Sequence, residues 1–337
     1  MKKIVYLVIS MFIFLSCNKS LNEKVSMIDL EPSMEIEELS DSTFFRGIYS
    51  MIFSDCIYAV DEFNGRILKL DTNLNLLNTI GRIGQGPQEL AGIGCIGVWK
   101  DTLLAINVGG KRLNTYSAYG QFIESHLFDD IYIAQNNFCI DDEGFLYFTS
   151  IIDSFPIVKY DRNMNRQFSF GHWIEPDNKD FRRYLNDYHI AFIDNKIITV
   201  QTDAPIINMY DKDGKHLLKK ELPDQLFKKR LMFKKTEQEK DVANMKKIYK
   251  LFSCISTIDN KIYLPYIDHD DEQNIPYINK VVEIIFKNND FIINKVYVLS
   301  RDNKGWFNTI VITNSNKIIA SNPSLQMDPT ISVFQMP

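Results

Sequence analysis

The sequence lacks the short motifs that mark the commonest catalytic and metal sites. It holds no CxxC pair and no cluster of cysteine and histidine, which argues against a zinc site of the usual spacing. There is no G-x-S-x-G elbow of a serine hydrolase and no Gly-Lys-Ser/Thr of a phosphate-binding loop. A basic excess is also missing, because 38 Lys and Arg stand against 43 Asp and Glu. The net charge of -5 gives no overall positive field, so we predict no nucleic-acid partner.

The apolar run at residues 4–15 is too short to span a bilayer comfortably. It follows two lysines and ends at Ser16-Cys17, an order typical of a bacterial lipoprotein signal, in which the cysteine becomes the lipidated first residue. The alternative is a core helix that ends at a chance cysteine. The abrupt polarity after Cys17 favours the signal, so we predict a signal peptide over 1–16 and a tether over 17–24.

The residue after Cys17 bears on location, since an aspartate there retains such lipoproteins at the inner membrane. Asn18 stands in that place, which favours the outer membrane, on its periplasmic or its outer surface. Export permits disulfides, but the remaining cysteines are far apart in apolar, strand-like segments, so we expect buried free thiols. These cysteines are Cys56, Cys95, Cys139 and Cys254.

Short strands, by contrast, recur throughout the chain. Residues 56–90 contain one unit with three strands separated by turns at Asn64-Gly65 and Asp71. Similar units follow with a period near 45–50 residues, which is typical of a β-propeller. The predicted strands are 43–54, 57–60, 66–70 and 74–80; 93–99, 102–107, 112–116 and 122–127; 138–141, 145–150, 157–160 and 166–170; 190–193, 196–201, 206–210 and 216–222; 252–258, 261–266, 277–286 and 291–299; and 306–313, 317–321 and 330–334.

The sixth unit has only three strands, and the strand Val25–Leu30 is left over at the other end of the chain. Pairing this N-terminal strand with the sixth unit would close the ring and remove an exposed edge. We therefore predict an all-β domain over 25–337, a six-bladed β-propeller whose last blade is closed by the N-terminal strand.

An insertion at 223–251 interrupts the strands, and we predict that it is helical. Thr236 and Glu239 have the spacing of a capping box, and apolar residues at helical spacing follow from Val242 to Phe252. The segment is locally basic on an acidic protein. We expect a solvated cap on one propeller face; the alternative is contact with an acidic polymer or partner.

The Gly-rich loop 81–90, GRIGQGPQEL, is the most specific motif. Together with the signal ending at Cys17 and the repeated units, it resembles the six-bladed β-propeller lipoproteins of Bacteroidota, which are distantly similar to NHL-repeat propellers. The resemblance covers the whole chain. It implies fold and location more than chemistry, because no catalytic residues of a known activity carry over onto this sequence.

Candidate ligand-binding residues lie in three loops. The loop 81–90 is expected to be structural, with its charged and amide side chains pairing across blades, although Arg82 and Gln85 are candidates for ligand contact. The connection 171–189 combines aromatic, cationic and imidazole groups suited to sugars, peptides or carboxylates. Its candidates are Trp173, Arg182, Arg183, Tyr188 and His189.

The third loop contains Asp268 and His269 in a run of acidic residues. Carboxylates suit calcium, but the EF-hand spacing is missing, and a solvated acidic loop is favoured. We assign no metal site and no cofactor, with a divalent cation left as an alternative. By propeller topology all three loops emerge on one face, near the mouth of the channel.

These observations predict a membrane-anchored, exported binding module rather than an enzyme, with a glycan, a peptide or an envelope protein as its partner. The first alternative is a metal-assisted enzyme of the lactonase or lyase type on the same scaffold. The second is a structural partner in an envelope complex. Fold alone does not choose among them.

Overall fold

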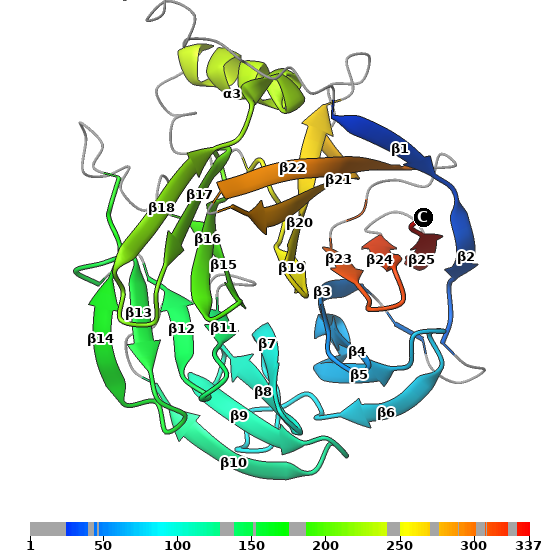
Figure 1. Cartoon of the computed structure of the whole chain (residues 1–337). Coiled ribbons are helices and arrows are strands. Elements are labelled where there is room, and N and C mark those ends of the chain that lie inside the picture. The colour runs from blue at the N-terminus through cyan, green and yellow to red at the C-terminus, as the bar shows by residue number, and fades with distance from the viewer. Residues whose placement is uncertain are drawn as a thin grey trace, which may run out of the picture.

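The computed structural model describes residues 25–39, 44–45, 47–128, 138–150, 153–174, 187–240, 250–269, 276–288, 290–300, 307, 309–322 and 329–337. Their strands form six sheets arranged around a central axis, with the helix α3 at the rim (Figure 1). The predicted six-bladed β-propeller is confirmed. The signal peptide, the tether and Cys17 lie outside the described residues.

Each blade has four antiparallel strands, of which the first lies innermost, next to the axis. From the inner to the outer edge the strands are β3 (Ile48–Phe53), β4 (Ile57–Asp61), β5 (Arg66–Leu70) and β6 (Leu76–Ile80) in blade 1; β7 (Ile93–Trp99), β8 (Thr102–Asn107), β9 (Arg112–Ser117) and β10 (Phe122–Leu127) in blade 2; β11 (Phe138–Ile140), β12 (Leu146–Thr149), β13 (Ile157–Tyr160) and β14 (Arg166–Phe170) in blade 3; β15 (Tyr188–Ile193), β16 (Lys196–Gln201), β17 (Ile206–Tyr210) and β18 (His216–Glu221) in blade 4; β19 (Ser256–Ile258), β20 (Lys261–His269), β21 (Pro276–Lys287) and β22 (Asp290–Leu299) in blade 5; and β23 (Thr309–Ile312), β24 (Lys317–Asn322), β25 (Thr330–Gln335) and β2 (Pro32–Ile36) in blade 6.

The N-terminal segment closes the ring, but not with the strand that we predicted. The predicted strand exists as β1 (Ser26–Leu30), yet it pairs in parallel with β22 as a fifth strand of blade 5. The next strand, β2, pairs antiparallel with β25 and completes blade 6. One extended segment thus bridges two blades, a pairing that the strand count did not reveal.

Burial explains the residue pattern along each blade. The second strand β4 is buried at every position, because both of its faces pack against neighbouring blades. The outer strand β18 alternates between exposed and half-buried residues, since one face meets solvent. The sequence of a middle strand such as β4 is therefore a run of mostly apolar residues, whereas that of an outer strand such as β18 mixes apolar and polar residues.

The hydrophobic core consists of six clusters, one for each interface between neighbouring blades. Blades 1 and 2 share a cluster that includes Tyr58, Ile67, Leu103 and Tyr116. The other five clusters join blades 2 and 3, 3 and 4, 4 and 5, 5 and 6, and 6 and 1 in the same manner. The stabilising apolar contacts thus form a ring between the sheets, and the axis itself is not the core.

The predicted turns that begin with aspartate recur between the third and fourth strands. Asp71, Asp161 and Asp211 each accept hydrogen bonds from the backbone N–H groups two and four residues later, at 2.8 to 3.1 Å. The fourth residue of each turn has positive φ. In the first turn it is Leu74, which tolerates this conformation while its side chain is buried in the core between blades 6 and 1.

The insertion contains a helix, as predicted, but the helix begins eight residues earlier than the capping box indicated. After the short helical turn η3 (Asp224–Leu226), α3 spans Lys228–Lys240, so Thr236 lies inside it. Phe227 fixes the start, because its ring packs edge-on against Phe252 and Tyr266 with centroids 5.4 and 5.1 Å apart. This packing outweighs the local capping signal. Residues 241–249, with most of the predicted apolar stripe, lie outside the described part of the chain.

Removal of the two N-terminal strands is expected to destabilise the propeller. A chain starting at residue 37 leaves the edge of β25 unpaired. It also lacks the Leu30 side chain, which is part of the core between blades 5 and 6. At about 2–4 °C per kcal/mol for a large domain, we expect a fall in melting temperature on the order of 10 °C, with aggregation. Calorimetry and gel filtration would measure both, against a control chain starting at residue 25. Equal melting temperatures and monomeric elution of both chains would contradict this role.

Candidate functional site

The two faces of the disc are built from different connections. Links between blades and between second and third strands meet on one face, which we call the loop face. Short turns such as Asp71–Asn75 form the opposite turn face. Neighbouring loops of the loop face are joined, since the Gly109 N–H donates to the Ala91 carbonyl at 2.8 Å and the Leu251 N–H to the Thr202 carbonyl at 2.6 Å.

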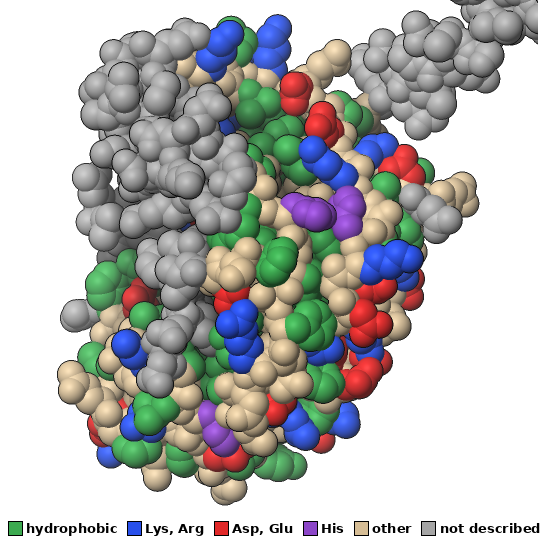
Figure 2. All heavy atoms as spheres, turned by 90° about the vertical axis from the view of Figure 1, so that its left-hand side faces the viewer, with side chains coloured by type: hydrophobic (Ala, Val, Ile, Leu, Met, Phe, Trp, Pro, Cys, Tyr) green, Lys and Arg blue, Asp and Glu red, His purple; other side chains and the backbone are tan. Residues whose placement is uncertain are grey.

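Seen from the side, exposed hydrophobic groups are interspersed with charged ones around blades 3 and 4 (Figure 2).

The Gly-rich loop 81–90 is held by a frame of polar side chains. Glu89 accepts a hydrogen bond from the Gly86 N–H at 2.8 Å, which is the main cause of its lowered pKa. The fully buried Asn107 of blade 2 donates to the Glu89 carbonyl at 2.8 Å and accepts from the Ala91 N–H at 3.0 Å. Gly84 is required here, because its φ is +154° and a Cβ would lie 2.1 Å from the Glu89 carboxylate.

The two predicted ligand residues of this loop are exposed and do not converge on a cavity. Arg82 pairs with Glu89 of the same loop at 3.1 Å, which corrects our expectation of pairing across blades. Gln85 lies at the solvent-facing tip. The exposed large hydrophobic side chain of this loop is Ile83, which is 66% exposed.

The connection 171–189 is described only at its two ends. The indole N–H of the half-buried Trp173 donates to the Ser154 carbonyl at 2.9 Å, which ties this connection to the neighbouring loop of blade 3. Tyr188 begins β15 and is buried, and desolvation raises its pKa. Arg182 and Arg183 lie outside the described residues.

His189 is a core residue of blade 4 rather than a surface ligand. It is 1% exposed, its Nε2 lies 3.1 Å from the Phe252 carbonyl, and its Nδ1 has no hydrogen-bond partner. Burial lowers its pKa to about 4, against an opposing effect of the Asp187 carboxylate, while Lys250 adds slightly to the lowering. The imidazole is therefore neutral at pH 7 and joins blade 4 to blade 5.

This burial predicts a loss of stability on acidification. Above pH 6.5 the imidazole is neutral in both folded and unfolded chains, so its contribution is flat. Between about pH 6.5 and 4 the unfolded chain binds the proton more readily, and about 3 kcal/mol of unfolding free energy is lost. In a His189→Gln variant we expect a shallower slope in this window, measured by urea unfolding at each pH. An unchanged slope would show that other groups cause it.

Asp268 and His269 belong to strand β20 rather than to the predicted loop, and the acidic residues that follow them lie outside the described part of the chain. Asp268 is buried, and the Lys280 ammonium donates to its carboxylate at 2.5 Å. This pair crosses from β20 to β21 and holds the long hairpin of blade 5 together. The side chain of His269 lies outside the described part.

Helix α3 is attached to the loop face by polar contacts. Lys234 donates to the buried Asp203 carboxylate at 2.7 Å, and the Arg230 guanidinium donates to the Lys250 carbonyl at 3.0 Å. The Gln201 side chain also donates to Asp203, at 2.8 Å. The expected cap on the propeller is thus present, with part of the basic charge used for attachment.

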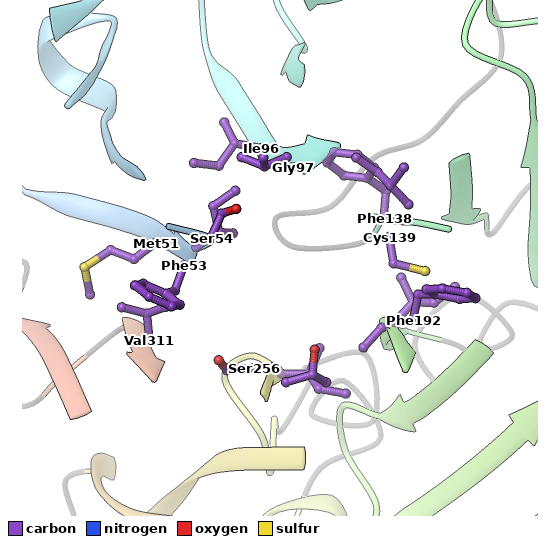
Figure 3. Close-up of a pocket in the computed structure, with 17 residues that line it drawn as sticks. Met51, Phe53, Ser54, Ile96, Gly97, Phe138, Cys139, Phe192, Ser256 and Val311 are labelled. Carbon is purple, nitrogen blue, oxygen red and sulfur yellow. The ribbon is translucent and has the colours of Figure 1, made fainter. Parts of the chain in front are cut away.

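A cavity of about 240 Å³ lies on the axis, where the six inner strands surround an open space (Figure 3). Phe53, Phe138 and Phe192 are among the residues that line it. Its polar lining groups include the Ser54, Ser256 and Thr257 hydroxyls and the Cys139 thiol. Burial raises the pKa of Cys139 well above its ordinary value, so the thiol is neutral.

The cavity does not coincide with the predicted site. Its lining comes mainly from the carboxyl-terminal halves of β3 and β7 and the equivalent parts of other inner strands, so it lies toward the turn face. A signal for it is present in the sequence, because the described first strands of all six blades contain no Asp, Glu, Lys or Arg. This signal is visible only when the six strands are compared with one another.

Among the described residues, no three His, Cys, Asp or Glu side chains come together as a metal site would require. The four cysteines in this part are free thiols, as predicted, with Cys139 half-buried and the others buried. No described helix is both long enough and apolar enough to cross a membrane.

Comparison with known proteins agrees with this geometry. Residues 38–181 match the family model DUF5128, described as a 6-bladed beta-propeller. This match and the similar structures given next support a six-bladed propeller family. A Bacteroides fragilis protein inferred to be exported superposes with a TM-score of 0.55 at 13% identity, over 92% of this chain and 99% of that one. No curated protein matches.

Two further structures show the same fold at low identity. A DUF4221 family member from Bacteroides vulgatus has a TM-score of 0.51 at 11% identity and covers 91% of this chain and 97% of its own. Virginiamycin B lyase from Staphylococcus aureus has a TM-score of 0.51 at 11% identity and covers 90% and 99%. At these identities the likeness concerns the fold alone. The lipoprotein signal and the distant similarity to NHL repeats stay predictions.

Proposed function

We propose that the protein is an exported, membrane-anchored binding module that holds an uncharged, partly apolar ligand in its central cavity. The observation that carries this proposal is the lining of the cavity, in which free strand edges and hydroxyl groups meet aliphatic and aromatic residues without any acidic or basic side chain among the described residues. An ionic ligand would lose its hydration there without gaining a countercharge.

The geometry of the inner strands suits such a ligand. Each inner strand has a hydrogen-bonded neighbour on one side only, so its other edge faces the axis. Unpaired backbone N–H and C=O groups at that edge offer donors and acceptors to a neutral polar group. Directed hydrogen bonds to backbone and hydroxyl groups are what small-molecule sites commonly use to fix the orientation of a ligand.

Binding accounts for these features better than bond cleavage. General acid–base chemistry needs a titratable group poised near neutral pH, and the one titratable group on the wall is a thiol held neutral by burial. The likeness to a lyase concerns the fold, and function resides in the site. We therefore keep the binding role over the lactonase or lyase alternative.

Export and anchoring are supported by the sequence around Cys17 and by the fold shared with a protein inferred to be exported. A Cys17→Ala variant is expected to leave the membrane fraction or to accumulate as the unprocessed precursor. Fractionation after a salt wash, with an immunoblot for precursor and mature forms, would measure this. Normal processing together with membrane retention would rule out lipidation at this position.

Filling the cavity should abolish uptake of a neutral aromatic probe. We expect N-phenyl-1-naphthylamine to bind the parent chain saturably, with a rise in fluorescence. A Thr257→Trp substitution places an indole on the cavity wall and should weaken this binding at least about ten-fold, which corresponds to about 1.4 kcal/mol. Thr79→Trp, on the exposed outer strand of blade 1, is the matched control and should bind as the parent does.

A charged analogue completes this experiment. 1-Anilinonaphthalene-8-sulfonate has the same rings with an added sulfonate, and we expect it to bind the parent chain at least about ten-fold more weakly, because the cavity offers no cation. Equal probe binding by the two tryptophan variants, or tighter binding of the sulfonate, would overturn the proposed site.

A further inference from the structure

Four large apolar side chains are exposed on adjacent loops of blades 1 and 2, all on the loop face. Phe44, Phe63, Ile83 and Val108, which we call the apolar tips, are 60%, 54%, 66% and 45% exposed. Single exposed hydrophobic residues are common on any protein, but several on neighbouring loops indicate a contact surface.

Three of the tips gather around one turn. A Cβ added to Gly65 would lie 2.7 Å from the Ile83 Cα, so the Gly-rich loop rests directly on the turn that contains Phe63. Directly after this turn, Arg66 at the start of β5 donates to the Phe44 carbonyl at 2.6 Å. Val108 follows on the adjacent loop, where its N–H donates to the Gly92 carbonyl at 2.8 Å. The tips thus belong to one connected set of loops.

These loops hold the tips in place. Asn107 and Asn114, both fully buried, bind the Glu89 carbonyl from blade 2, and Arg66 is paired with the buried Asp61 at 2.8 Å. Because the backbone is fixed by these bonds, Ile83 does not fold back onto the protein to hide its side chain. Rigid presentation lowers the entropy lost when such a surface meets its partner.

Charge indicates the kind of partner. Exposed Lys111 stands beside the tips, together with Arg82, which is paired with Glu89. Across the ring (Figure 1), the insertion on the same face contains α3, in which six of thirteen residues are basic and two are acidic. The exposed part of α3 includes Lys228, Lys229 and Lys235. Prominent apolar side chains on a face that also carries exposed cations are a combination that binds a lipid surface containing anionic headgroups.

We infer that the loop face rests on an anionic lipid bilayer, with the apolar tips inserted at the level of the headgroups and the basic helix α3 drawn to the surface charge. This inference rests on the membrane anchoring proposed above, and it places a second, non-covalent contact between the folded domain and the membrane. The tips stand out from the surface, and a fluid bilayer accommodates such protrusions without a shaped groove.

Vesicle binding by an unlipidated chain tests the inference apart from the anchor. A chain starting at residue 18, which holds every described strand, is mixed with vesicles of three parts phosphatidylethanolamine to one part phosphatidylglycerol and sedimented. We expect the parent chain to sediment with these vesicles. A Phe63→Ser, Ile83→Ser double variant is expected to bind at least about ten-fold more weakly, since it loses both apolar side chains.

The matched control is a Tyr119→Ser, Ile123→Ser double variant, which removes two exposed apolar side chains at the turn and outer strand of blade 2. It should bind as the parent does, and unchanged melting temperatures would show that both variants fold. Replacing Lys228, Lys229 and Lys235 with glutamine should reduce binding to these vesicles.

Failure of the parent chain to sediment, or equal binding by the two serine variants, would overturn the inference. Neither outcome bears on Cys17, whose lipidation is tested by fractionation of the full chain. If Cys17→Ala abolishes anchoring while the unlipidated chain does not bind vesicles, the lipid anchor is supported and the docking face is ruled out.

Discussion

Packing between neighbouring blades is the interaction on which the rest of this molecule depends. A single four-stranded blade has two apolar faces and no partner of its own, so each face must be covered by the next blade. The six core clusters are the result, and each draws its side chains from two adjacent sheets. Because every cluster needs both of its blades, the ring is stable only when closed, and the N-terminal strands β1 and β2 serve this closure.

The same constraint creates the axial cavity and leaves the faces free to vary. Side chains of the inner strands turn toward the interfaces between blades, while the free strand edges surround the axis and cannot pair with one another. An opening of about 240 Å³ remains there. Most residues of the core clusters belong to strands, so the loops can carry an insertion such as α3 or a polar frame such as Asn107 and Glu89 without loss of the ring.

Local patterns predicted the four core strands of blades 1 to 5 and three strands of blade 6 to within a few residues. They failed where the outcome depends on distant contacts. The partner of β1 is decided by its match to β22, and the start of α3 is decided by the packing of Phe227 on Phe252 and Tyr266. A strand count and a capping box contain neither of these facts.

Candidate site residues were harder to predict than strands, for a related reason. His189 and Asp268 have the chemistry of ligands, but burial between strands turns one into a neutral core residue and the other into the partner of Lys280. Type and spacing do not reveal burial at the end of a strand. The cavity was missed because its wall is shared by six strands, none of which looks like a site when taken alone.

The cavity and the apolar tips occupy opposite ends of the disc. The cavity is lined by the later halves of the inner strands, toward the turn face, whereas Phe63 and Ile83 lie on the loop face. A domain that rests on a bilayer through the tips therefore turns its cavity away from the lipid and toward the aqueous phase. Anchoring and ligand binding then do not compete for the same surface, and a neutral ligand reaches the axis without crossing the face that contacts the membrane.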